Sequence, residues 1–196
     1  MRTATRLKLD CAQRVLEFCR RYPDSAPSAL EVVAHLGHLI DQADTLTEQQ
    51  EAAQAAESAA LGDRDAIAAG IRQRLVHLVR LCCAAALREG EVTLRLNAPS
   101  GADRYGPFLN AAQDAVAAAS VHRDTLDRYG MPAGMLEELE RNLERCQAAQ
   151  ERRLEAHAAS LAAGSALAAV AGEALLTIRH LDALNRIWLA CDLERL

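Results

Sequence analysis

Hydrophobic and polar positions alternate along most of the chain with the 3.6-residue spacing of an α-helix. In the first such stretch, one face carries Ala12, Val15, Leu16 and Cys19, which predicts an amphipathic helix from about Thr5 to Arg21. The same spacing recurs further along the chain and predicts five more helices, at about Ser28–Ala60, Arg64–Arg88, Arg104–Tyr129, Ala133–Ala163 and Ala166–Leu193.

Proline and glycine mark where the predicted helices end. Pro23 and Pro27 close the first helix, because proline cannot continue a helix interior. Leu61-Gly62-Asp63 and Gly164-Ser165 predict hairpin turns, each between two helices. Residues 91–107 predict an extended linker, since Val92, Leu94 and Leu96 alternate with polar residues and a lone strand has no partner.

The predicted helices fall into two similar sets. Arg21-Tyr22-Pro23 and Arg128-Tyr129-Gly130-Met131-Pro132 form corresponding corners, and each precedes a long helix whose far half is mostly alanine with polar residues. This pattern indicates an internal duplication. We therefore expect an all-α fold, a six-helix bundle built from two similar three-helix units with long antiparallel helical hairpins. The units would comprise residues 1–90 and 108–196, joined by the linker within one compact domain.

The composition supports this fold class and narrows the function. Hydrophobic residues make up 51% and aromatic residues 3% of the 196 residues, and alanine, the best helix former, is the commonest residue. The net charge of −5 is mixed along the chain without a basic stripe, so we expect no nucleic-acid partner. Ala158–Ile178 has the length of a membrane span, but its Ala, Gly and Ser content favours close helix packing, and we expect no membrane partner.

The six cysteines form no Cys-x-x-Cys pair, and most lie among apolar residues. This is typical of reduced thiols in the core of a cytoplasmic protein. The adjacent Cys82 and Cys83 cannot form a relaxed disulfide on one helix. His77 and His180, each followed by leucine, are compatible with a phosphotransfer site but are more typical of packed histidines.

One helix face carries residue types that could ligate a metal ion. Glu31, His35, His38 and Asp41 lie within about three turns of the predicted second helix. Two imidazoles and a carboxylate are suitable ligands for Zn or Fe. The Glu-x-x-His pattern of di-metal bundles is absent, however, and solvated histidines explain the same spacing. We therefore expect no bound metal and no cofactor, and identify no catalytic residue.

The chain resembles a loose group of uncharacterised bacterial all-helical proteins. The resemblance lies in Phe108-Leu109-Asn110-Ala111-Ala112, in the Tyr129–Pro132 corner and in the Leu139/Leu143 stripe that follows. No function is assigned to that group, so the resemblance implies a helical fold and no site.

The sequence favours a structural or protein-binding role over a catalytic one. Long alanine-rich helices and the apolar segment Trp188–Leu196 predict a non-catalytic scaffold or protein-interaction module. Its expected partner is another protein or a second copy of itself, as a homodimer. The alternative is a metal- or small-ligand-binding helical bundle that uses His35 and His38.

Overall fold

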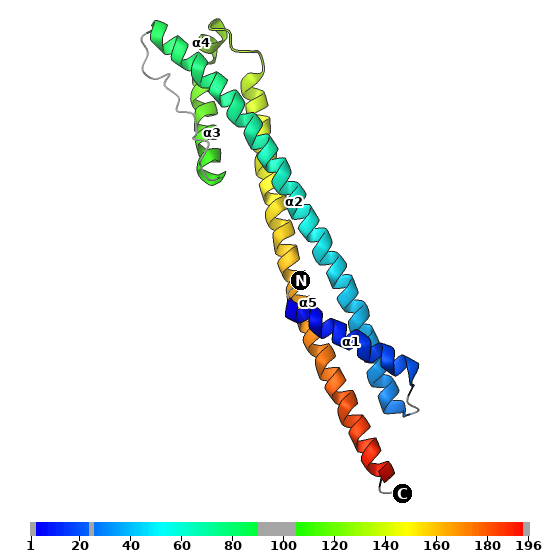
Figure 1. The fold of residues 1–196 in the computed structure, drawn as a ribbon. Helices are drawn as coiled ribbons and strands as arrows, with labels where there is room; N and C mark the ends of the chain where they lie inside the picture. Colours follow the sequence, from blue (N-terminus) through cyan, green and yellow to red (C-terminus); the bar gives the residue numbers. More distant parts are fainter. Residues whose placement is uncertain (1–2, 24–25, 90–104, 194–196) are drawn as a thin grey trace. The chain divides into compact units, whose positions relative to one another are not determined.

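The computed structural model describes residues 3–23, 26–89 and 105–193, with residues 89 and 188–193 described by their backbone alone. In this part of the chain every regular element is an α-helix (Figure 1), namely α1 Thr3–Arg21, α2 Pro27–Glu89, α3 Tyr105–Val121, α4 Arg123–Arg128 and α5 Met135–Leu193. The prediction of an all-α protein is confirmed. The described residues form five helices, so the six-helix bundle is not confirmed.

The turns predicted at Leu61–Asp63 and Gly164–Ser165 are wrong, because both segments are helical, within α2 and α5. A glycine in a helix interior costs only about 1 kcal/mol relative to alanine, and the alanine-rich sequence on both sides favours the helix. Among the described residues, only Gly130 and Gly134 have the positive φ that a glycine stop requires, at 86° and 79°. Both belong to the segment between α4 and α5, where the sequence also predicts a corner.

The described helices form two compact units, and both α2 and α5 contribute to each of them. Unit 1 comprises Met1–Ala56 and Ala156–Leu196, and unit 2 comprises Glu57–Glu155. This division differs from the predicted one of residues 1–90 and 108–196, because α2 and α5 continue through the predicted turns. Residues 91–104 of the predicted linker lie outside the described residues, and Tyr105 already begins α3.

In unit 1, α2 and α5 run antiparallel. His35 of α2 lies beside Glu173 of α5, and the side-chain amide of Gln50 fills the place where a Cβ on Gly164 would lie. α1 lies across this pair, with Leu16 in the shared core (Figure 1). The buried members of this core are Ala12, Leu16, Leu36, Leu39, Ala43, Leu167, Val170, Ala174 and Leu181.

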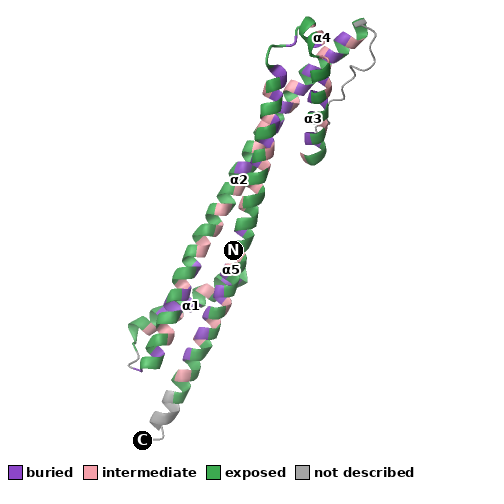
Figure 2. Ribbon diagram, turned by 180° about the vertical axis from the view of Figure 1, so that it is seen from behind, coloured by how far each residue is buried: buried purple, intermediate pink, exposed green. Residues whose placement is uncertain are grey.

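In unit 2, α2 and α5 also run antiparallel, as ion pairs of Arg153 with Glu57 and of Arg74 with Glu138 show. The predicted hairpins would have paired consecutive helices, whereas the observed antiparallel pairs join segments from the two halves of the chain. The core of this unit is nevertheless made of apolar residues at helical spacing, among them Ile71, Leu75, Leu78, Cys82, Phe108, Ala112, Leu126, Leu136, Leu139, Leu143 and Cys146. Buried and exposed positions alternate along both long helices (Figure 2).

The start of α3 is held against α2 and α5 by polar contacts. The Tyr105 hydroxyl donates to the Cys146 carbonyl oxygen at 3.1 Å, and the Arg64 guanidinium carbon lies 5.3 Å from the centre of the Tyr105 ring. Burial is the main cause that raises the pKa of Tyr105 to about 12. One turn further along α3, the ring of Phe108 is fully buried, and the Arg72 guanidinium lies 4.3 Å from its centre. These cation–π contacts anchor α3 where its first turns begin.

Candidate interaction surface

α1 carries two apolar faces, and only one of them is covered. Thr5, Ala12 and Leu16 are buried against α2 and α5. A second set, which we call the outer stripe, comprises Leu7, Cys11, Phe18 and Tyr22. These residues follow one another at intervals of four, seven and four, so they share one side of the helix. Exposed fractions are 63% for Leu7, 62% for Phe18 and 62% for Tyr22, and Cys11 is exposed as well.

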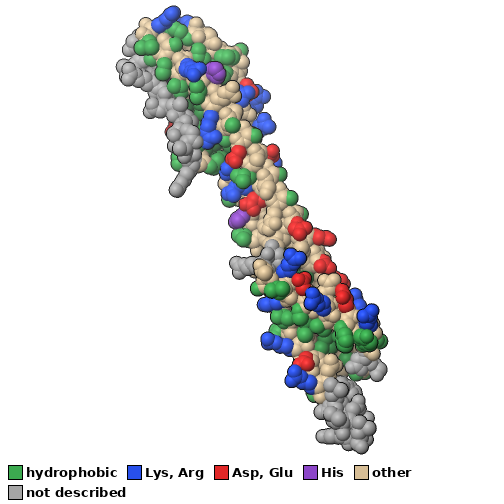
Figure 3. Space-filling model, viewed as in Figure 1, with side chains coloured by type: hydrophobic (Ala, Val, Ile, Leu, Met, Phe, Trp, Pro, Cys, Tyr) green, Lys and Arg blue, Asp and Glu red, His purple; other side chains and the backbone are tan. Residues whose placement is uncertain are grey.

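The outer stripe forms a shaped surface. The rings of Phe18 and Tyr22 lie with their centres 5.0 Å apart in a tilted arrangement. A shallow hollow of about 350 Å³ is lined by Leu7, Cys11 and Phe18 of the stripe together with Asp10, Arg14 and Val15. Figure 3 shows hydrophobic side chains gathered over the α1 region, with charged side chains beside them. Aromatic residues are enriched in protein interfaces. Only 3% of this chain is aromatic, yet two aromatic residues, Phe18 and Tyr22, are exposed together in the outer stripe.

Two charged residues line the same hollow. Asp10 and Arg14 lie four residues apart on α1, on one flank of the outer stripe. Neither has an ion pair with another residue in the described part of the chain. The hollow therefore presents an apolar centre with one acidic and one basic group, both open to an external partner.

Sequence reasoning identified the inner face of α1 and missed the outer stripe. The signal was present, because the spacing of Leu7, Cys11 and Phe18 fits a helix as well as that of Ala12 and Leu16 does. A helix with apolar residues on two sides can bury both of them or leave one side exposed. In the described part of the chain, the outer stripe of α1 is exposed.

The four candidate metal ligands do not converge in the structure. Glu31, His35, His38 and Asp41 are all exposed on α2. His35 Nε2 lies 3.2 Å from Oε1 of Glu173 on α5, a contact that the sequence did not predict. Within the described residues, no group of three or more His, Cys, Asp and Glu side chains is placed to hold a metal ion. This geometry provides an exposed His–Glu pair that links two helices.

The described cysteines are all free thiols in different environments. Cys82 and Cys146 are buried, and burial raises the pKa of both thiols, that of Cys82 to about 11. These two fit the predicted core role, whereas Cys11 and Cys83 are exposed. Reactive thiols need a lowered pKa and access to solvent, so neither Cys82 nor Cys146 is a candidate nucleophile.

α5 contains a segment that is long and apolar enough to cross a membrane. Within Met135–Ile187, an 18-residue window is apolar enough to cross a membrane, and 33% of that window is buried. Core helices of soluble proteins share this length and composition, so the finding leaves the expected absence of a membrane partner as a prediction. The side chains of the apolar segment from Trp188 onward lie outside the described residues.

Comparison with models of known protein families, with curated proteins and with solved structures finds no match.

Proposed function

We propose that this protein is a non-catalytic helical interaction module that self-associates through the outer stripe of α1. The observation that carries the proposal is the exposure of Leu7, Phe18 and Tyr22 on one side of a helix whose opposite side is already buried. Contiguous exposed apolar residues with charged neighbours are typical of protein-interaction sites.

The charges beside the stripe favour a second copy of the chain as the partner. When two copies of α1 pack antiparallel about a twofold axis, residues whose numbers have a constant sum lie opposite each other. A sum of about 25 places Leu7 opposite Phe18 of the other copy. The same register places Asp10 close to Arg14 of the other copy, and it does so twice because the contact is symmetric. This register places the two charge pairs near the twofold axis and one Leu7–Phe18 contact on either side of it, so both kinds of contact are satisfied together.

Analytical ultracentrifugation over a wide concentration range tests the proposal. We expect a monomer–dimer equilibrium for the unmodified chain. Phe18→Glu should weaken the dimer about a hundredfold or more, because each of two phenylalanines loses about 1.5–3 kcal/mol of burial. Leu176→Glu on α5 is the matched control, since Leu176 has the same exposed fraction of 62% and should leave the equilibrium unchanged. Both variants change exposed residues, so circular dichroism should show unchanged folding.

Charge reversal tests the register. Asp10→Arg and Arg14→Asp should each weaken the dimer, because like charges then face each other across the twofold axis. Mixing the two single variants should restore association, since every pair between the two different chains is again complementary. A contact within one helix would not be repaired by mixing. A monomer at every concentration, or dissociation by Leu176→Glu in place of Phe18→Glu, would overturn the assignment to α1.

A further inference from the structure

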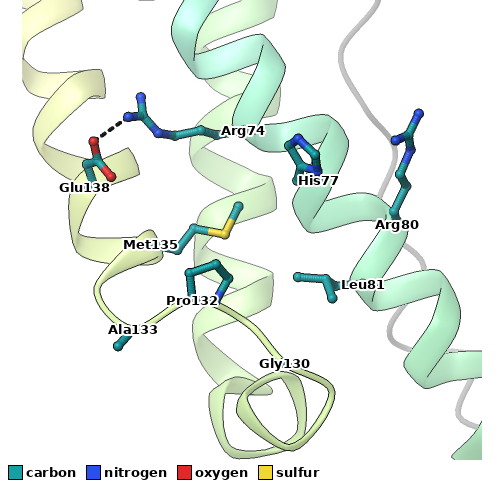
Figure 4. A pocket seen from close by; sticks show the side chains of 9 residues that line it. All are labelled: Arg74, His77, Arg80, Leu81, Gly130, Pro132, Ala133, Met135 and Glu138. Carbon is teal, nitrogen blue, oxygen red and sulfur yellow. Dashed lines mark hydrogen bonds and ion pairs between the residues drawn. The ribbon is translucent and has the colours of Figure 1, made fainter.

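A cavity of about 550 Å³ lies in unit 2 between α2 and the segment that leads from α4 into α5. This volume falls in the range of small-molecule sites. On one side the wall is Leu81 of α2, and on the other it is Pro132 and Met135 (Figure 4). We call this cavity the corner groove.

The α4–α5 wall of the groove is held in place by backbone hydrogen bonds. Met131 N donates to Leu126 O at 3.0 Å, and Glu138 N donates to Gly134 O at 2.9 Å. Gly130 and Gly134 adopt positive φ, and proline at 132 restricts its own φ. A wall that is fixed before binding saves the entropy of ordering it, which favours affinity for a small ligand.

The polar groups of the groove have an excess of positive charge. Glu138 is the one acidic residue among the described lining residues, and it is already paired with Arg74 (Figure 4). His77 and Arg80, one turn apart on α2, have no hydrogen bond or ion pair with any residue that the structure describes. The Arg80 side chain points away from Met135 and Pro132, so its guanidinium faces the rim only after a change of side-chain rotamer (Figure 4). In a chain of net charge −5, this rim is a local basic site.

From this arrangement we infer that the corner groove binds a small aliphatic carboxylate. In the bound state the hydrocarbon chain lies between Leu81, Pro132 and Met135. The carboxylate lies at the rim, where it accepts hydrogen bonds from the His77 imidazole and from the Arg80 guanidinium, which turns toward the groove. Charge-assisted hydrogen bonds of arginine to a carboxylate are the strong kind. The ligand is thus amphipathic, with its apolar part in the cavity and its charge toward solvent.

Methyl NMR of methionine-labelled protein tests the inference, because the chain has only three methionines and one of them, Met135, lines the groove. Titration with sodium octanoate should shift the Met135 signal in a saturable manner. Octan-1-ol, which has the same chain length without the charge, should bind about tenfold more weakly, as expected for the loss of one charge-assisted hydrogen bond.

Variants assign the rim contact. Arg80→Gln should lower octanoate affinity about tenfold and leave octanol affinity unchanged. Arg179→Gln, which removes an exposed arginine of unit 1, is the matched control and should change neither. The inference is overturned if octanoate gives no saturable shift of Met135, if octanoate and octanol bind equally, or if the two arginine variants behave alike. Arg80 is exposed, so its replacement should not impair folding.

Discussion

Gly62 lies inside α2, at a position where the sequence favours a turn, and replacing it with alanine distinguishes the two conformations. A Cβ built on Gly62 would meet no atom within 4 Å, so the added methyl group has room. In a helix interior, alanine is favoured over glycine by about 1 kcal/mol. We therefore expect Gly62→Ala to raise the free energy of unfolding by about 1 kcal/mol.

Gly130→Ala is the matched control, because that glycine also has free space around a Cβ but has φ of 86°. A non-glycine residue in the left-handed region is penalised by roughly 1–2 kcal/mol, so this variant should be destabilised. The two substitutions add the same methyl group and should shift stability in opposite directions. A turn at Gly62 with positive φ would instead make both variants less stable.

Urea unfolding followed by circular dichroism measures both effects. Thermal unfolding gives a second measurement, because about 1 kcal/mol corresponds to a change of roughly 2–4 °C in the melting temperature of a chain of this size. The midpoint should rise for Gly62→Ala while the slope with urea concentration stays constant, because the exposed surface of the unfolded chain is the same. A lower midpoint for Gly62→Ala would refute the continuous helix through residue 62.

Two further predictions concern the cysteine thiols and the Tyr105 hydroxyl. With a thiol reagent at neutral pH, we expect Cys11 and Cys83 to react in the folded protein and Cys82 and Cys146 to react only after unfolding; early modification of Cys82, mapped by mass spectrometry, would contradict its burial. Folding raises the pKa of Cys82 from 9.0 to about 11 and that of Tyr105 from 10.0 to about 12, so the unfolded chain loses these protons first. Stability should therefore be unaffected by these groups below pH 9 and should fall as the pH rises toward 11. The urea midpoint measured from pH 8 to 11 checks this, and the decline should be shallower in Cys82→Ala; a midpoint that stays constant would contradict it.

The helices and their inner faces could be predicted from the sequence, whereas the continuity and pairing of the long helices could not. Pro23 follows the end of α1 as predicted, whereas Pro27, which was predicted to close the first helix, is the first residue of α2, a position where proline is favoured. Gly130 and Pro132 correctly predict the corner before α5. Glycine at 62 and 164 is compatible with either a turn or a helix, so local sequence does not decide between them. Packing decides, because each helix has a covered face on both sides of the predicted turn, with Ala60 and Ala68 buried around Gly62 and Ala163 and Leu167 buried around Gly164.

The candidate surfaces could likewise be predicted from the sequence only in part. The outer stripe is visible as a spacing of Leu7, Cys11 and Phe18, but only the fold shows that the opposite side of α1 is already covered. The contact of His35 with Glu173 joins residues 138 positions apart, and no periodicity connects them. The corner groove likewise requires α2 to lie beside the α4–α5 segment, which follows from the antiparallel pairing of α2 with α5 and not from any motif.

The interleaved make-up of the two units has a consequence for synthesis on the ribosome. Unit 2 is one uninterrupted stretch, Glu57–Glu155, and can close as soon as that stretch has emerged. Unit 1 needs Ala156 and the residues after it, so the leucines that α1 and the start of α2 will bury stay without their partners while all of unit 2 is translated. The part of unit 1 that is made before unit 2 is therefore among the last to acquire its native contacts, and a chaperone that shields nascent apolar segments would act there.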